Sequence, residues 1–222
     1  MKKITFLIAL FGMLLMSTVT SYASDLVTSG SVGVYSRYFD HGYDQSNGKA
    51  FSTLSGTVAY DALSVSVLAK QSISGQSGYN GIEGSVDYAL SKNASFGVRS
   101  YSIADVRNDQ DLDAHISLTD GAFTINAERR IAGINTSGTY GELVITTHPI
   151  KNIDVQVVSG VGNKIYTASN DLKFQLVNEA IVIKTNVAND VSVFGTAVYN
   201  SALHQTFKTN DILYGVGLSV NL

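Results

Sequence analysis

The amino-acid sequence predicts an all-β fold, a transmembrane antiparallel up-and-down β-barrel of about twelve strands. Three observations support this prediction: apolar and polar positions alternate along most of the chain, short turns and long polar loops follow one another in order, and aromatic residues gather near the ends of the predicted strands. Since neighbouring side chains of a strand point to opposite faces, such segments have one apolar face and one wet face.

The composition agrees with many short strands. The 222 residues include 20 glycines and 12 tyrosines, and 15% of the residues are charged, below the ~25% that is usual for soluble domains. The net charge of −3 and the lack of a basic cluster indicate no nucleic-acid partner. Without cysteine there are no disulfides or thiolate metal sites, and we expect no cofactor and no bound metal.

Residues 1–23 are predicted to be a secretory signal peptide. Lys2 and Lys3 precede the apolar segment 4–16, and Ser21 and Ala23 supply the small residues that signal peptidase recognises. Residues 24–222 then form one domain, the barrel. Because this domain has no apolar run of about 18 residues, it can span a membrane only as a closed barrel.

The alternation is clearest at residues 211–222, where every second residue is apolar up to the C-terminus. The predicted strands lie near residues 29–39, 51–60, 63–70, 82–90, 96–101, 112–119, 123–130, 139–147, 153–157, 181–187, 191–199 and 211–222. The last strand alone fits either the closing strand of a barrel or the last strand of a soluble β-sandwich, since both have an apolar face.

The connections favour the barrel over the sandwich. Short turns are predicted near Asp61, Lys92, Asp120, Ile150 and Asn189. Between them lie longer polar loops, near residues 40–50, 72–81, 104–111, 132–138, 161–177 and 201–210. An even number of strands with short turns at one end and long loops at the other is typical of outer-membrane barrels.

Aromatic residues give an independent indication. On the apolar face, Tyr60, Tyr88, Phe96 and Phe123 are predicted near the short turns, and Tyr38, Tyr199 and Tyr214 near the long loops. Rings at both interfaces form the aromatic girdles of membrane barrels, and a soluble sandwich does not require this arrangement.

The polar face carries the charged residues. The predicted pore-lining residues are Arg37, Lys70, Glu83, Asp87, Arg99, Asp113, Glu128, Arg130, Glu142, Asp154 and Lys184. In a barrel they line either a constriction that orients small polar solutes or a salt-bridge network that plugs a narrow lumen. Five cations against six anions predict no strong ion selectivity. Arg129 is expected to point outward near the outer rim, where it can snorkel or meet lipopolysaccharide phosphates.

No enzymatic activity is expected. His115 shares a strand face with Asp113 and Ser117, the residue types of a hydrolytic relay. However, side chains at i and i+2 of a strand are about 7 Å apart, too far for direct hydrogen bonds. No Gly-x-Ser-x-Gly motif is present either.

Residues 35–46, Y-S-R-Y-F-D-H-G-Y-D-Q-S, resemble the opening of a family of poorly characterised proteobacterial outer-membrane porins. Such proteins commonly begin with an aromatic-rich strand followed by Arg-Gly, and His41 stands here in place of the arginine. The resemblance implies a porin-like barrel without an established substrate.

The sequence thus leads to the hypothesis of a cell outer-membrane channel for passive diffusion of small polar solutes, in contact with outer-membrane lipids including lipopolysaccharide. The alternative is a non-conducting surface barrel whose loops bind a partner, and an outer-membrane lipid hydrolase is a third possibility.

Overall fold

The structure is a computed structural model. It describes residues 26–37, 39–40, 43–44, 49–73, 80–103, 110–133, 138–163, 175–188, 190–199 and 212–221. The predicted signal peptide and Tyr38 lie outside the described residues. In the part of the chain that the structure describes, no helix is long and apolar enough to cross a membrane.

Twelve long strands form the fold, together with a two-stranded hairpin. The long strands are β1 Leu26–Tyr35, β4 Phe51–Tyr60, β5 Leu63–Ser72, β6 Gly81–Ser91, β7 Ala94–Ile103, β8 Gln110–Asp120, β9 Phe123–Ala132, β10 Thr139–Ile150, β11 Ile153–Gly162, β12 Gln175–Ala188, β13 Val191–Tyr199 and β14 Ile212–Asn221. The hairpin consists of β2 Phe39–Asp40 and β3 Tyr43–Asp44.

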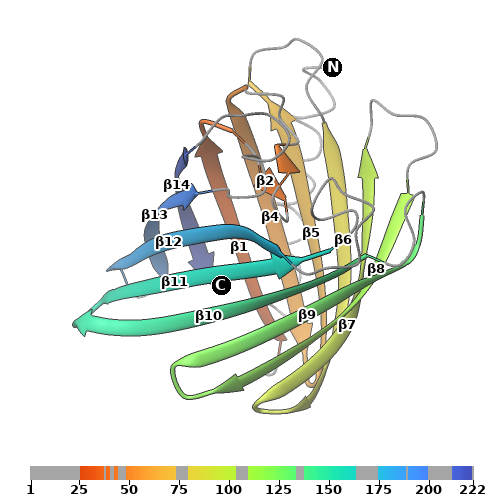
Figure 1. The fold of residues 1–222 in the computed structure, drawn as a ribbon. Coiled ribbons are helices and arrows are strands. Elements are labelled where there is room, and N and C mark those ends of the chain that lie inside the picture. Colours follow the sequence, from red (N-terminus) through yellow and green to blue (C-terminus); the bar gives the residue numbers. More distant parts are fainter. Residues whose placement is uncertain are drawn as a thin grey trace.

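The twelve strands close into an antiparallel barrel (Figure 1). Each long strand pairs with the next in the chain, and β1 pairs with β14 over the register from Ser29↔Asn221 to Tyr35↔Gly215. Closure gives the edges of both terminal strands a hydrogen-bonding partner, which membrane-spanning strands need because lipid offers none. The predicted fold class and the closing role of the last strand are confirmed.

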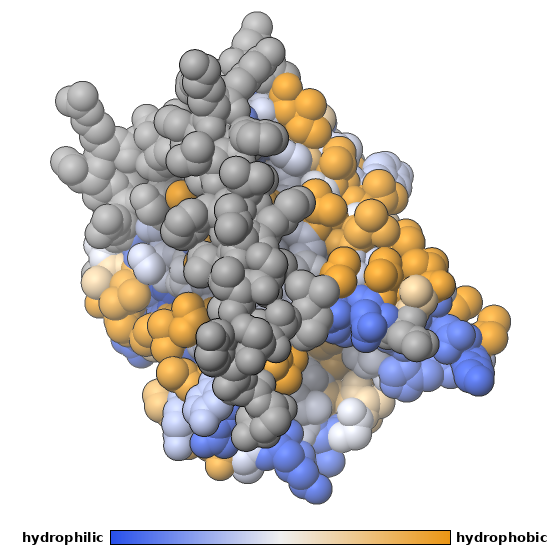
Figure 2. Space-filling view, turned by 180° about the vertical axis from the view of Figure 1, so that it is seen from behind, coloured by the Kyte–Doolittle hydropathy of each residue, from blue (hydrophilic) through white to orange (hydrophobic). Residues whose placement is uncertain are grey.

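The barrel is apolar on its outward face and polar on its inward face, the reverse of a soluble protein. Large apolar side chains are exposed on the outside, for example Val216 at 64% and Val67 at 50%, whereas Asp113 on the inside is 0% exposed. Figure 2 shows apolar side chains over much of the outer surface of the strands. An exposed apolar surface of this extent is stable only against an apolar environment, which agrees with a lipid-facing barrel.

Two-residue turns join the strands at one end of the barrel. They lie at residues 61–62, 92–93, 121–122 and 151–152, close to four of the predicted turn positions. Asp61, Gly121 and Asn152 have positive φ values of 53°, 56° and 69°. Tight hairpin turns need this left-handed backbone, and Asp, Asn and Gly adopt it most easily.

The strand limits differ from the predicted ones most of all in β1, β11 and β12. β1 begins at Leu26 and ends at Tyr35, earlier than predicted, and β12 begins at Gln175 instead of near Ile181. A register shift between Gly160 and Val161 lets β11 and β12 remain paired beyond the alternating segment. The β2–β3 hairpin lies in a predicted loop, because two residues per strand are too few to show an alternation.

Candidate functional site in the barrel lumen

Cross-strand pairing determines which side chains share the inward face, since directly paired residues point to the same side of a sheet. Ten of the eleven predicted pore-lining residues occupy this face: Lys70, Glu83, Asp87, Arg99, Asp113, Glu128, Arg130, Glu142, Asp154 and Lys184. Arg37 lies two residues beyond the end of β1, in a bend.

The inward face has a charged wall and a largely neutral wall. β5 to β10 form the charged wall and carry all of these charged residues except Asp154 and Lys184. On β1, β4, β13 and β14 the described inward positions are mostly small, hydroxylated or aromatic, for example Ser31, Ser55 and Gly217. The Oγ atoms of Ser31 and Ser55 are hydrogen-bonded at 2.7 Å. The lumen is therefore chemically asymmetric.

Arg130 forms the centre of the ion pairs on the charged wall. Its Nε and NH2 donate to the two carboxylate oxygens of Asp113, at 2.8 and 3.2 Å, and its NH1 lies 2.6 Å from Asp111 Oδ2. This two-pronged geometry is the strong form of an arginine–carboxylate pair. It explains how Asp113 can be fully buried, because a buried carboxylate is tolerated only when it is paired.

Tyr101 of β7 joins this pair to two further cations. Lys70 Nζ, the Arg99 guanidinium carbon and the Arg130 guanidinium carbon lie 5.7, 6.0 and 5.9 Å from the centre of its ring. Lys70 also pairs with Glu83, and Arg99 NH1 lies 3.2 Å from Glu128 Oε2. The face of an aromatic ring attracts cations, so Tyr101 holds three of them against the wall.

His115 bonds across a strand. Its Nε2 donates to Asp87 Oδ1, although β7 lies between the strands of the two residues. Gly97 of β7 is paired directly with both residues and lacks a side chain, so the imidazole and the carboxylate meet above its Cα atom. Ser85 Oγ donates to the second oxygen of Asp87, at 3.1 Å.

Asp113 and His115 of β8, two of the residue types of a hydrolytic relay, have separate partners on other strands. Asp113 pairs with Arg130, whereas His115 pairs with Asp87, so the aspartate of the same strand does not orient the imidazole. Ser117 is hydrogen-bonded to neither residue in the described structure. These three side chains therefore do not form a Ser-His-Asp relay.

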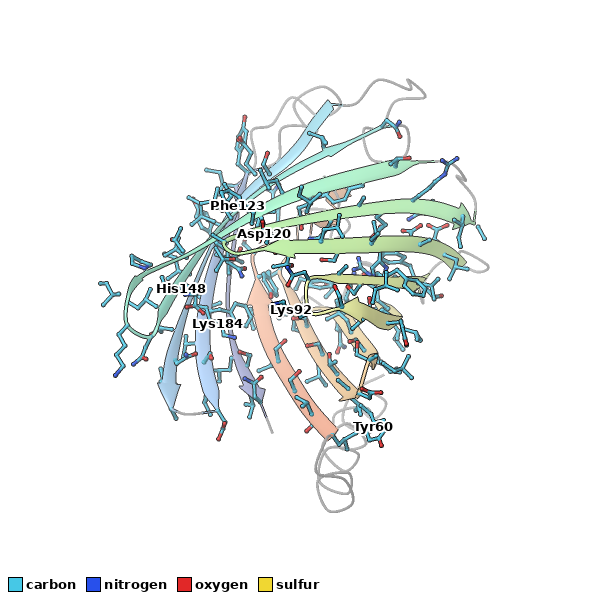
Figure 3. All side chains as sticks on the ribbon, turned by 90° about the horizontal axis from the view of Figure 1, so that it is seen from below. Tyr60, Lys92, Asp120, Phe123, His148 and Lys184 are labelled. Atoms are coloured by element: carbon cyan, nitrogen blue, oxygen red, sulfur yellow. The ribbon has the colours of Figure 1, made fainter. Side chains whose placement is uncertain are left out.

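Glu142 of β10 is held by neutral groups. Tyr140 donates its hydroxyl to Oε2 at 2.9 Å, and Asn126 donates its amide to Oε1 at 3.1 Å. Nearer the short turns, Asp154 Oδ1 lies 2.8 Å from His148 Nδ1, and Lys184 is its direct cross-strand neighbour. Figure 3, seen from below, labels His148 and Lys184 on the same side of the barrel.

A polar cavity of about 280 Å³ opens along the charged wall. Its lining includes Asp87, Arg99, His115, Glu128, Tyr140 and Glu142. Among the described residues, no group of His, Asp and Glu side chains is arranged to hold a metal ion. The cavity is suited to water and to small solutes with hydrogen-bonding groups.

Two contributors to the wall were not predicted as site residues. Asp111 lies at the end of a predicted loop, where the alternation gave no face for it. Tyr101 lies on the inward face as the alternation indicated, but it has no charge, and the predicted pore-lining residues are all charged. Its position among three cations could have been suspected only from the strand register.

The predicted girdle residues that the structure describes lie on the outward face. Tyr60, Tyr88, Phe96, Phe123 and Tyr214 are between 47% and 61% exposed, and Tyr199 is partly exposed. The rings of Tyr88 and Phe96 are neighbours, with centroids 5.9 Å apart. Figure 3 labels Tyr60 and Phe123 at the ends of strands that border short turns.

Comparison with known proteins gives structural relatives only. No protein-family model and no curated protein matches the chain. The KdgM porin, solved alone and in complex with disordered oligogalacturonate, has TM-scores of 0.60 and 0.59 at 10% identity; the two matches cover 86% and 87% of this chain and 98% of KdgM. The NanC porin has a TM-score of 0.55 at 13% identity, covering 89% of this chain and all 100% of NanC.

An outer-membrane channel from Pseudomonas putida F1 is also similar, with a TM-score of 0.50 and 10% identity over 90% of this chain and 97% of that one. At such identities the likeness concerns the fold. These structural neighbours are channels, and their fold is the one that the resemblance of residues 35–46 implied. The chain therefore has the porin-type β-barrel fold.

Proposed function

We propose that this protein is an outer-membrane channel through which small polar solutes diffuse passively. The observation that carries the proposal is the polarity of the closed barrel, with charged residues on the inward face and apolar residues on the outward face. The porin fold supports the same location and activity. The predicted signal peptide, residues 1–23, would direct export, leaving residues 24–222 as the mature barrel.

The direction of the ion pairs supports an open lumen. The ion pairs between described residues join strands that are adjacent or two apart, as Lys70 with Glu83 and Arg99 with Glu128 do. Strands on opposite sides of a twelve-stranded barrel are six apart. Salt bridges that plugged the lumen would connect such strands, whereas these hold the side chains along one wall.

The eleven predicted pore-lining residues are proposed to contact the solute or its water. Arg37, just past β1, would act at the long-loop end, and the other ten along the barrel wall. Binding of oligogalacturonate is observed for KdgM and is not carried over to this chain. For the present chain we propose only the broader class of small polar solutes, because the charged wall and the cavity offer both donors and acceptors.

Lipid contacts are proposed for the outward face. The exposed aromatic residues and Tyr38 would form the girdles at the two interfaces. Arg129 is exposed on the outward face of β9 and pairs with Thr139 at the start of β10, near the long-loop end. A guanidinium there would bind lipopolysaccharide phosphates.

Conductance of the refolded mature protein in planar lipid bilayers tests the proposal. We expect discrete, ohmic current steps that are absent from detergent blanks and from protein that has not refolded. Refolded protein that inserts but conducts no current at any salt concentration would contradict the channel function. Binding of a partner by such a non-conducting barrel, lost on deletion of a long loop, would then indicate the alternative surface function.

A further inference from the structure

We propose that the lumen prefers cations to anions, and that Asp87 and Glu142 carry this preference. This inference rests on the proposed channel function and specifies the class of solute that passes most easily. Sequence reasoning alone predicted no strong selectivity, because it compared nearly equal numbers of charges. The structure shows which of these charges compensate one another.

Carboxylates outnumber cations on the inward face. At the strand positions that the structure describes, seven carboxylates face inward together with four lysines and arginines: Glu83, Asp87, Asp111, Asp113, Glu128, Glu142 and Asp154 against Lys70, Arg99, Arg130 and Lys184. The excess arises partly because Arg130 alone serves both Asp111 and Asp113.

Asp87 and Glu142 are the carboxylates whose charge is least compensated. Asp87 is bonded to the hydroxyl of Ser85 and the imidazole of His115. Glu142 is bonded to the hydroxyl of Tyr140 and the amide of Asn126. Hydroxyl and amide donors hold a carboxylate in place without cancelling its charge, and so does a neutral imidazole. At a pH where histidine is ordinarily neutral, both side chains therefore keep a negative potential around them.

Both carboxylates border the cavity of about 280 Å³. Asp87 comes from β6 and Glu142 from β10, so they approach it from different strands. Glu128 adds a third carboxylate, and among the described residues of the lining Arg99, which pairs with Glu128, is the one arginine or lysine. Low-dielectric walls concentrate such a field, which raises the local concentration of cations.

The charges on β11 and β12 do not offset this excess. Asp154 and Lys184 are direct neighbours on β11 and β12, so their fields largely cancel. The net negative charge of the described inward positions therefore lies along β6 to β10. A solute with an ammonium group would be attracted to this wall, and a solute with a carboxylate would be repelled by it.

The direct test is the reversal potential in a KCl gradient at pH 8, where histidine side chains are ordinarily neutral. We expect a potassium-to-chloride permeability ratio of about 3 near 0.1 M salt, falling toward 1 at 1 M, because the Debye length shrinks from about 10 to about 3 Å. A ratio at or below 1 in the dilute solution would overturn the inference, while the current itself would still support the channel function.

Variants that remove the charge of a single side chain test which residues carry the cation preference. Asp87→Asn and Glu142→Gln keep the shape of the side chains, and their combination is expected to lower the permeability ratio at least twofold, to about 1.5 or less. Asp120→Asn removes the same charge at an exposed position at the end of β8 and should leave the ratio unchanged. An equal effect of all three substitutions would refute the assignment to the cavity.

Solute flux gives a second measurement that does not depend on the variants. Vesicles containing the wild-type barrel should admit a four-carbon diamine several times faster than a four-carbon dicarboxylate of the same length, and a neutral diol at an intermediate rate. Equal rates for the three solutes would overturn cation preference but leave passive diffusion intact. Entry of none of them would contradict the channel function itself.

Discussion

Gly97 offers the sharpest test of how the charged wall is built. The bond between His115 and Asp87 passes over its Cα atom. A Cβ atom at this position would lie 2.5 Å from Asp87 Oδ1, 2.5 Å from the Val86 carbonyl oxygen and 2.8 Å from His115 Nε2. Side-chain atoms could move away, but the carbonyl oxygen belongs to the β6 backbone. Gly97→Ala should therefore both strain the sheet and separate the bonded pair.

The expected cost follows from these two effects. Overpacking by one methyl group typically costs ~1–3 kcal/mol. Loss of a hydrogen bond to a charged group adds ~1.5–3 kcal/mol, and water in the lumen would replace part of it because Asp87 is 27% exposed. We therefore expect Gly97→Ala to lower the free energy of unfolding by about 2–4 kcal/mol.

Gly84 provides the matched control on the neighbouring strand. It lies on the outward face, and the nearest atom to an added Cβ would be the Ser66 carbonyl oxygen at 4.0 Å. Because alanine loses less backbone entropy than glycine in a strand, Gly84→Ala should be neutral or stabilise the barrel by up to ~1 kcal/mol. The two substitutions are thus expected to have effects of opposite sign or very different size.

Urea unfolding of both variants in lipid vesicles measures the difference. Far-ultraviolet circular dichroism is the suitable signal, since the chain has no tryptophan. In addition, Asp87→Asn should destabilise the wild-type barrel more than it destabilises Gly97→Ala, where the bond is already broken. Equal losses of unfolding free energy for Gly97→Ala and Gly84→Ala would refute the proposed hydrogen bond between His115 and Asp87 over Gly97. Additive effects of Gly97→Ala and Asp87→Asn would refute it as well.

Three further predictions concern the wall and the register. Arg130→Met leaves two carboxylates of β8 without their cation and should cost about 3–5 kcal/mol in urea unfolding, whereas Arg129→Met on the exposed outward face should cost less than about 0.5 kcal/mol. Tyr101→Leu removes the ring beside three cations and should destabilise the barrel by about 1–2 kcal/mol more than Tyr101→Phe, which keeps it. Because the chain lacks cysteine, Ser66→Cys should react with a water-soluble maleimide in membranes and Val67→Cys should not; the reverse order would show that the β5 faces are exchanged.

The sequence was sufficient to predict the barrel, its turns and the strand face on which most of the charged residues lie. Alternation has a period of two, so residues such as Lys70 and Glu83 could be assigned to a face without knowing their neighbours. The order of short turns and long loops then indicated antiparallel pairing of successive strands. Both signals are local in the chain, which is why they could be read directly.

The contacts within the site depend on register, which the sequence did not reveal. The alternation could show that His115 shares a strand face with Asp113, but not that its partner is Asp87, 28 residues away. That bond also requires a glycine at the intervening position of β7. Likewise, the alternation could show that Glu142 points inward, but not that its partners are neutral.

The strands at the closing seam, β13, β14 and β1, keep the lumen clear by a different means from the charged wall. Phe194 pairs directly with Gly217, and Tyr35 pairs with Gly215, so each ring lies over a glycine where a Cβ atom would clash. On the charged wall, ion pairs between strands that are adjacent or two apart, together with Tyr101, hold the long side chains instead. Gly97, Gly215 and Gly217 have the same role: at each of them a side chain of a neighbouring strand occupies the space that a Cβ atom would need. The rings over the glycines and the ion pairs both keep side chains along the wall of the barrel. An aqueous path through the lumen requires this arrangement.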